Sequence, residues 1–502
     1  AQLLVAVDGS SQAVDPEKLK SFGGVLSRTI SLPIRQNVSE SLPRAGVVVR
    51  PKVGDIPSMD FTRAADLVAR GEEAARSLAK ELSAFSVTEE EYRAFRERVR
   101  GRRPEPPVVD AIQTVSAGVD PRQVTSRLET RVGKPLDVAV LRRDLDRIYE
   151  MGVFETVDFR LLRDEGRNVL LIDARPKSWG PTFLRVGSAF EANFDGNAAL
   201  ALRATVHAMQ LNGRGGELKG TIELGTVPGA HLEYYQPLDY RGRFFVSADV
   251  LYQRSLARVD VPGGPVGEAR VSVLQGSADG GISLGSFGQI HAGVFRGTGG
   301  AKILLAEEPQ EDLSFDHGGV FGYAGYDTLD DLSFPRRGTL AAGRLEAFLD
   351  GMGSDSTFYR FFARGIQALP LGPKTTVVAS AGWEDTLGSD PPYYMLFTLA
   401  DFNRFSALSR EIVAGERAAS LSAAISHRVG SLPTRVGRGV YVGGTFELAR
   451  VWRRREETSL AGLRPAGGVY AGADTVLGPI YAGVGIGYGG NTSFYVFLGR
   501  PF

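Results

Sequence analysis

Two short segments carry the residues that are best suited to covalent chemistry. Gly281–Gly285, with the sequence GISLG, places Ser283 in the GxSxG pattern that serine hydrolases use to expose a nucleophile on a sharp strand-to-helix turn. The residues that follow alternate through Phe287, Gln289 and His291, which predicts a strand rather than the required helix. We therefore do not assign Ser283 as a nucleophile.

The second segment is Asp8-Gly9-Ser10, which has the form of an aspartate motif that could assist a serine nucleophile. No GxSxG motif precedes it in this chain, and Ser10 and Ser11 are predicted to lie in a surface turn. The sequence thus predicts no catalytic residue in this chain.

Composition excludes several other kinds of chemistry. The chain has no cysteine, so disulfide scaffolds, cysteine nucleophiles and cysteine-ligated metals are excluded. Lys+Arg and Asp+Glu number 58 each, which gives no general case for nucleic-acid binding. The histidines lie far apart in the sequence and have no acidic partner at motif spacing, so we predict no metal or cofactor site. We expect them in the lumen or in loops; they are His207, His231, His291, His317 and His427.

The elements that must position these residues fall into three regions, of which the first, residues 1–100, mixes strands and helices. The apolar runs Leu3–Val7 and Val47–Val49 are typical of buried parallel strands. Apolar residues recur at helical spacing from Asp60 to about Phe85, and Thr88-Glu89-Glu90-Glu91 is a capping box for a second helix that ends near Arg100. A proline-rich linker follows at 101–107.

The second region, 108–177, is predicted to be a small α+β domain of order βααββ. Its expected elements are a strand at Val108–Val115, helices at Pro121–Leu128 and Asp137–Met151, and strands at Phe154–Leu162 and Asn168–Ala174.

The third region, 181–502, divides into sixteen alternating segments separated by glycine-rich turns. The expected strands are 181–193, 197–209, 215–226, 229–238, 243–254, 268–279, 282–296, 314–326, 339–350, 355–369, 374–386, 415–429, 438–450, 463–474, 479–488 and 492–502. No run of eighteen apolar residues occurs, so no membrane helix is predicted. The even number of strands favours a closed, antiparallel transmembrane β-barrel.

The last segment gives the clearest alternation. Phe494, Val496, Leu498 and Phe502 share one face, which predicts a closing strand that meets lipid or another barrel. A soluble sandwich gives a similar alternation, but an apolar, aromatic final strand favours the barrel.

Two further features of this region are candidate sites. Phe334, Pro335, Arg337 and Gly338 form a turn in which proline stops strand pairing and glycine permits the backbone angle. The longest irregular stretch, about 387–413, lies between the eleventh and twelfth expected strands.

These patterns resemble a known combination of domains. Residues 108–177, with Gly152-Val153-Phe154-Glu155-Thr156-Val157 after an Asp/Arg-rich helix, look like a POTRA domain. The turn at Phe334 resembles the FPxxG motif of BamA-like barrels, and Asp474–Phe502 resembles their closing hairpin, whose last strand is the insertion signal. This resemblance implies an arginine from the 387–413 loop inside the lumen; Arg410 is the first candidate, Arg404 the second, and Glu447 the candidate partner. A merely solvated Glu447 is an equal alternative.

Residues 1–85 resemble the last third of a patatin-like phospholipase domain, through Leu3–Val7, Arg35–Val38, Val49–Ile56 and Gly71–Ala75. Patatin, POTRA and barrel in this order is the architecture of type Vd autotransporters. The resemblance implies a Gram-negative outer-membrane protein with its POTRA domain in the periplasm, partnered by the lipid bilayer and the barrel assembly machinery. It also implies a passenger that hydrolyses phospholipid through a Ser-Asp dyad, which we expect to lie before Ala1.

A different class of function stays open. The chain could be a non-enzymatic BamA-like insertase or a translocator for a separate partner protein; the single POTRA-like domain argues against a multi-POTRA insertase. Whether the passenger faces the periplasm or the cell surface, and whether the barrel forms a homo-oligomer, is not decided by the sequence.

Overall fold

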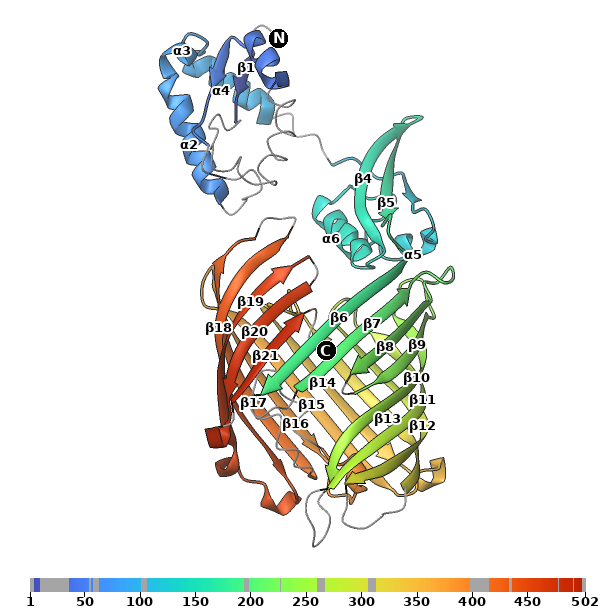
Figure 1. Ribbon diagram of the computed structural model, residues 1–502. Coiled ribbons are helices and arrows are strands. Elements are labelled where there is room, and N and C mark those ends of the chain that lie inside the picture. The colour runs from blue at the N-terminus through green and yellow to red at the C-terminus, as the bar shows by residue number, and fades with distance from the viewer. Residues whose placement is uncertain are drawn as a thin grey trace. The chain divides into compact units, whose positions relative to one another are not determined.

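The computed structural model describes residues 4–9, 36–53, 56, 63–100, 106–193, 198–225, 227–259, 267–305, 313–397, 415–432, 436–476, 478–490 and 492–498 (Figure 1). The chain divides into two compact units, one ending at Glu105 and the other beginning at Pro106. No helix within the described residues is both long and apolar enough to cross a bilayer.

The described part of the N-terminal unit contains a two-stranded parallel sheet and several helices. Strand β1 (Val5–Val7) pairs in parallel with β2 (Val47–Val49), as the apolar runs predict. Val47 and Val49 are buried, but Val5 and Val7 are exposed, so the predicted burial is wrong for β1. The first predicted helix is divided at Leu78 into α2 (Ala64–Ser77) and α3 (Ala79–Ser83), and Asp60 lies outside the described residues. Helix α4 (Glu89–Arg100) begins at the predicted capping box, in which Glu91 accepts from the Thr88 backbone N–H at 2.9 Å and the Glu91 N–H donates to Thr88 Oγ1 at 3.2 Å.

The second unit begins with an α+β domain of the predicted order βααββ. Its elements are β3 (Ala111–Val115), α5 (Pro121–Thr125), α6 (Val138–Tyr149), β4 (Phe154–Asp164) and β5 (Arg167–Pro176), and the sheet order is β3-β5-β4. Asp120 and Asp137 cap the two helices through their side chains. Leu141 and Ile148 of α6 pack on Leu170 of β5 in the buried core.

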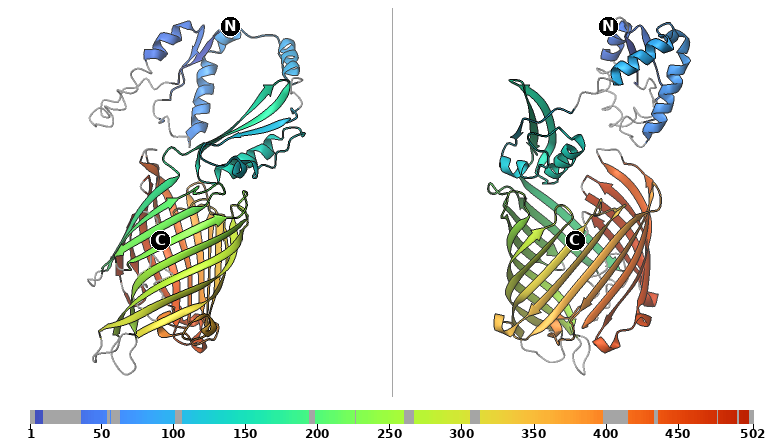
Figure 2. Two further views of the ribbon diagram at one scale, coloured as in Figure 1. Left: turned by 90° about the vertical axis from the view of Figure 1, so that its right-hand side faces the viewer. Right: turned by 180° about the vertical axis from the view of Figure 1, so that it is seen from behind.

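The remaining strands, as far as the chain is described, form a closed barrel of sixteen antiparallel strands (Figures 1 and 2). They are β6 (Thr182–Asn193), β7 (Ala198–Ala208), β8 (Glu217–Gly225), β9 (Gly229–Pro237), β10 (Phe244–Val259), β11 (Gly267–Ser283), β12 (Gly288–Leu305), β13 (Leu313–Asp327), β14 (Gly338–Phe348), β15 (Phe358–Pro370), β16 (Thr375–Asp385), β17 (Arg417–Gly430), β18 (Gly437–Trp452), β19 (Arg464–Thr475), β20 (Gly478–Ile486) and β21 (Thr492–Leu498). Each strand pairs with the next in sequence, and β21 pairs with β6.

All sixteen predicted segments coincide with these strands, but three boundaries differ clearly: β10 continues to Val259 instead of residue 254, β11 continues to Ser283 instead of residue 279, and β12 spans Gly288–Leu305 instead of 282–296. The turn between the sixth and seventh strands was expected near residue 280, but β11 continues to Ser283 and β12 begins at Gly288. Gly280 and Gly281 lie inside β11, opposite Ala292 and His291 of β12, so glycine here allows close packing rather than a turn.

Alternation along the strands separates an apolar outward face from a mixed inner face. Leu421, Phe446 and Val469, on three successive strands, are 48%, 54% and 67% exposed and point outward. The inward positions next to them, such as Ser422 and Tyr470, are half-buried, and Glu447 of β18 and Tyr495 of β21 are each 2% exposed. This arrangement is the one that a barrel in a bilayer requires.

Candidate functional sites in the barrel and its entrance

The lumen wall formed by β7 to β12 is lined with charged and polar side chains that pair across neighbouring strands. Arg203 of β7 pairs with Glu223 of β8, and His207 of β7 lies 2.7 Å from Glu217. Thr205 and Thr221 share a hydrogen bond of 3.0 Å between these two pairs. Arg203 and Thr205 lie directly opposite their partners in the sheet, and His207 lies diagonally opposite Glu217. These cross-strand contacts stabilise the register of β7 and β8.

Two further carboxylates continue this wall. Asp249 of β10 accepts a hydrogen bond from Ser277 and lies 3.3 Å from His231. Asp279 of β11 accepts from Ser247 at 2.7 Å and lies 2.9 Å from Nδ1 of His291. Sequence reasoning predicted lumen or loop positions for the histidines but missed these carboxylates, because the partners are 10 to 18 residues away and meet only through strand register.

The lumen wall formed by β12 to β15 is instead aromatic. Phe295, Phe321, Phe348 and Phe358 form one buried cluster. The guanidinium of Arg344 lies 4.1 Å from the centroid of the Phe321 ring. The wall from β7 to β12 thus offers ion pairs and hydroxyls. The wall from β12 to β15 adds rings and cation–π contacts to the ion pairs of Glu346 with Arg344 and Arg360.

The described start of the connection between β16 and β17, up to Phe397, lies against the aromatic wall of the lumen, and residues 398–414 lie outside the described residues. Tyr394 stacks on Phe315 of β13 with ring centroids 3.9 Å apart. Phe397 is 1% exposed and meets Phe362 of β15 edge-on at 5.3 Å. Arg360 lies 4.9 Å from the Phe397 ring.

The predicted lumen pair can be followed only in part. Arg410 and Arg404 lie outside the described residues. Glu447 is buried on the inner face of β18, opposite Ser422 of β17 and Ala466 of β19. The position on the lumen face agrees with the alternation, and the pairing with Arg410 stays a prediction.

The Phe334 turn connects β13 to β14 and is folded by its own carboxylates. Asp331 accepts from the backbone N–H groups of Ser333 and Phe334 at 2.7 and 2.9 Å, and Asp330 accepts from those of Arg336 and Arg337. Gly338 has φ +108°, and a Cβ there would collide with the Thr328 carbonyl, so glycine is required. The Phe334 ring is buried against the far strands β18 and β20, whereas Arg337 is exposed.

The closing strand meets β6 along a short seam. Pairing runs from Ser493 to Leu498 only, whereas β10 pairs with β11 from Phe244 to Val259. Phe494, Val496 and Leu498 share the outward face of β21, as predicted, and are exposed or half-buried. Phe502 lies outside the described residues. Within the described chain, residues 182–187 of β6 pair with β7 but have no partner in β21.

The α+β domain contacts two turns at one end of the barrel. Gln123 of α5, 3% exposed, donates to Gln210 Oε1 at 2.8 Å and to the Gly213 carbonyl at 3.2 Å. Arg127 donates to the Tyr240 carbonyl at 2.8 Å, and burial lowers the pKa of its guanidinium. A buried amide with two partners is well suited to fix the domain on the barrel entrance.

The two candidate hydrolase residues lie in unsuitable surroundings. Ser283 ends β11 and donates to the Gly285 carbonyl at 3.1 Å; a tight turn and strand β12 follow it, not a helix. Asp8 follows β1, is buried and lies 3.5 Å from Arg50. Ser10 and Ser11 lie outside the described residues.

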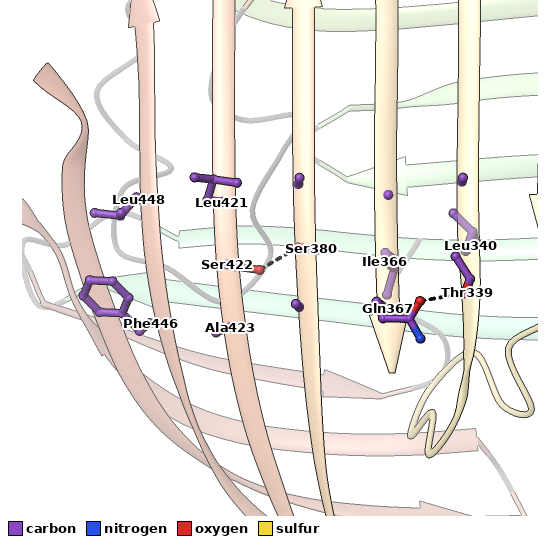
Figure 3. A pocket seen from close by; sticks show the side chains of 14 residues that line it. Thr339, Leu340, Ile366, Gln367, Ser380, Leu421, Ser422, Ala423, Phe446 and Leu448 are labelled. Atoms are coloured by element: carbon purple, nitrogen blue, oxygen red, sulfur yellow. Dashed lines mark hydrogen bonds between the residues drawn. The ribbon is translucent and has the colours of Figure 1, made fainter. Parts of the chain in front are cut away.

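The outer surface of β14 to β18 is indented. A pocket of about 470 Å³ lies among small residues such as Gly365, Ala379 and Ala423, with Leu421 and Phe446 at one end (Figure 3). Its lining is almost entirely apolar, so it is suited to lipid chains and offers no group for catalysis.

Comparisons with known proteins agree with this geometry. Residues 294–400 match the Omp85 superfamily domain, a stretch that contains the Phe334 turn. No curated protein matches the chain significantly.

Solved structures give the same result over more of the chain. BamA from Haemophilus ducreyi lacking POTRA domains 1–3 superposes with a TM-score of 0.56 at 13% identity, over 78% of this chain and 84% of that one. CdiB from Acinetobacter baumannii gives 0.54 at 11% identity over 78% and 74%, and CdiB from Escherichia coli gives 0.53 at 11% identity over 99% and 90%. The chain therefore has the barrel fold of BamA and CdiB and carries an Omp85 superfamily domain at residues 294–400.

Proposed function

We propose that this chain is an Omp85-type protein of the Gram-negative outer membrane, with its α+β domain acting as a POTRA domain in the periplasm. The observation that carries the proposal is the closed barrel with an apolar outward face and a polar and aromatic lumen, together with the Omp85 match that includes the Phe334 turn. A closed antiparallel barrel pairs the backbone groups of neighbouring strands with one another, as the bilayer core demands.

We further propose that residues 1–100 are the last part of a patatin-like passenger that the barrel anchors and exports. The parallel strands β1 and β2 support an α/β domain. Such a passenger would cleave acyl esters of phospholipid through a Ser-Asp dyad, to which no residue of this chain is assigned. Ser283 and Asp8 are not part of it, given their surroundings.

Insertion or translocation of a separate protein is the second candidate. The short β21–β6 seam favours it, because a strand with few interstrand bonds can exchange its partner for an incoming strand. In this case the barrel would act on another polypeptide, and the assembly machinery would be a partner in function as well as in biogenesis.

The membrane assignment is tested with two neighbouring residues of β17. Leu421 points outward and Ser422 points into the lumen. Leu421→Arg places a charge in lipid, which costs about 2–4 kcal/mol at the midplane, so insertion and heat-modifiable migration should fall. Ser422→Arg, the matched control, faces water and Glu447 and should insert normally.

Equal behaviour of the two variants would contradict the outer-membrane barrel.

A second experiment separates export of the N-terminal passenger from insertion of a partner protein. It uses a cysteine pair that locks the seam, Ser188→Cys with Leu498→Cys, at positions that lie opposite each other. Loss of partner-protein insertion on oxidation supports the second candidate; unchanged presentation of the N-terminal unit on intact cells supports the first.

A further inference from the structure

A lattice of tyrosine and glycine covers the inner face of the last four strands. In one cross-strand row Tyr441 of β18, Gly472 of β19 and Tyr481 of β20 lie side by side. In the next row the order is reversed. It runs Gly443, Tyr470, Gly483 and Tyr495, and ends on the closing strand.

Each ring in the second row lies over a glycine of the neighbouring strand. A Cβ on Gly443 would collide with the ring of Tyr470, and one on Gly483 would collide with the ring of Tyr495. The glycines are therefore spaces that the rings fill, a known way to protect glycine within a sheet.

In the first row the space over Gly472 is filled from outside the sheet. The Phe334 ring stacks on Tyr441 with centroids 4.2 Å apart and on Tyr481 at 4.7 Å. A Cβ on Gly472 would lie 3.0 Å from Phe334 Cζ. Phe334 thus sits in a socket of two tyrosines with glycine as its floor, although its own strands are β13 and β14.

Polar contacts fasten the turn to the same strands. The Tyr481 hydroxyl donates to the Ser333 carbonyl. Asp331, which shapes the turn, lies 3.5 Å from Arg438 at the start of β18. The buried aromatic cluster that contains Phe334 and Tyr481 extends to Tyr495 of β21.

We propose that the Phe334 turn is a brace that holds the closing hairpin β20–β21 from inside the lumen, and that Phe334 is the positioning residue for the β21–β6 seam. Among the described residues the seam is paired from Ser493 to Leu498, so its closure depends on how firmly β20 and β21 are held. The ring connects the middle of the barrel to this hairpin, and its withdrawal releases the seam. The inference rests on the barrel of the proposed function, and not on which polypeptide the barrel handles.

The test uses the absence of cysteine in the natural chain. One cysteine pair, Ser188→Cys with Leu498→Cys, reports the seam; a second, Leu345→Cys with Phe361→Cys, reports the β14–β15 pairing far from it. Phe334→Ala should lower the disulfide yield at the seam under mild oxidation, by about tenfold for the loss of two ring contacts, and leave the second pair unchanged.

Phe321→Ala is the matched control, since it removes a buried lumen ring of β13 that touches no residue of the closing hairpin. It should leave the seam yield unchanged. If Phe334→Ala prevents folding, Tyr481→Phe removes only the hydroxyl that binds the Ser333 carbonyl, and should lower the seam yield less.

Gly472→Ala supplies an independent measurement. It should lower the seam yield in the natural background, where its methyl group meets the Phe334 ring, and have a smaller effect together with Phe334→Ala, where Tyr481 Cδ1, 3.1 Å from the added Cβ, is the remaining close contact. Additive effects, or a seam yield that is unchanged in folded Phe334→Ala, would overturn the brace. Loss of both cysteine signals together would count against the barrel itself.

Discussion

The inner face of this barrel is organised by pairs of residues whose partners are distant in sequence. His291 meets Asp279 across one strand boundary, and Phe334 meets Tyr481 across most of the C-terminal half. Neither pair includes a nucleophile. The Ser283 hydroxyl donates to the Gly285 carbonyl in the turn that follows β11.

At the residue scale we therefore predict that this chain by itself has no esterase activity. The purified chain, refolded in detergent, should hydrolyse a short-chain acyl ester no faster than buffer, because Ser283 has neither a helix behind it nor a base beside it. Turnover that disappears in Ser283→Ala or Asp8→Ala would show that the assignment is wrong.

A second residue-scale prediction concerns pH. Arg147 binds Glu129 and holds the pKa of that carboxyl below its ordinary value of 4.5. A lowered folded pKa means that the pair stabilises the α+β domain above pH 4.5, and that this contribution is lost as the pH falls through the lowered value.

Hydrogen exchange in β4 and β5 should thus be faster in Glu129→Gln than in the natural chain near neutral pH, and the two should converge in acid. Glu150→Gln is the control, since this exposed carboxylate forms no ion pair among the described residues. A difference that persists below the lowered pKa would contradict the assignment.

At the element scale, alternation was sufficient to place all sixteen strands, because each strand is long and its two faces differ. The register between strands was not predictable, since it depends on pairing over distances that a local pattern does not record. The carboxylate partners of His207, His231 and His291 were missed for this reason.

The turn at Phe334 shows the same limit. Proline and glycine identified a turn, but the socket between Tyr441 and Tyr481 lies more than a hundred residues away. A signal was present in the recurring Tyr-x-Gly spacing at Tyr441, Tyr470 and Tyr481, which marks spaces that rings fill.

Gly338 gives the prediction at this scale. Gly338→Ala forces a side chain into φ +108° and against the Thr328 carbonyl, which should cost about 1–3 kcal/mol or more and lower the temperature at which the folded gel band is lost. Gly372→Ala, in another turn at the same end of the barrel, has no atom within 4 Å of the added Cβ and should be neutral. An unaffected Gly338→Ala barrel would show that the turn rearranges freely.

At the scale of the whole molecule, closure depends on the last strand. Without β21, both β20 and β6 would present unpaired backbone groups to a medium that cannot hydrogen-bond them. The α+β domain has its own buried core, built from Leu141, Ile148 and Leu170, so we expect it to fold whether or not the barrel closes.

Deletion of residues 494–502 should accordingly abolish outer-membrane insertion while the α+β domain remains resistant to protease. The deletion also removes the outward side chains of Phe494, Val496 and Leu498, each of which stabilises the inserted barrel by about 1.5–3 kcal/mol when it is buried in lipid or against a partner. Replacing these three by serine keeps the backbone bonds of β21 and removes the apolar face, so it should weaken insertion less than deletion does. Membrane fractionation with limited proteolysis measures both effects. Normal insertion of the deleted chain would mean that β6 and β20 can pair directly, and that the sixteenth strand is not needed to close the barrel.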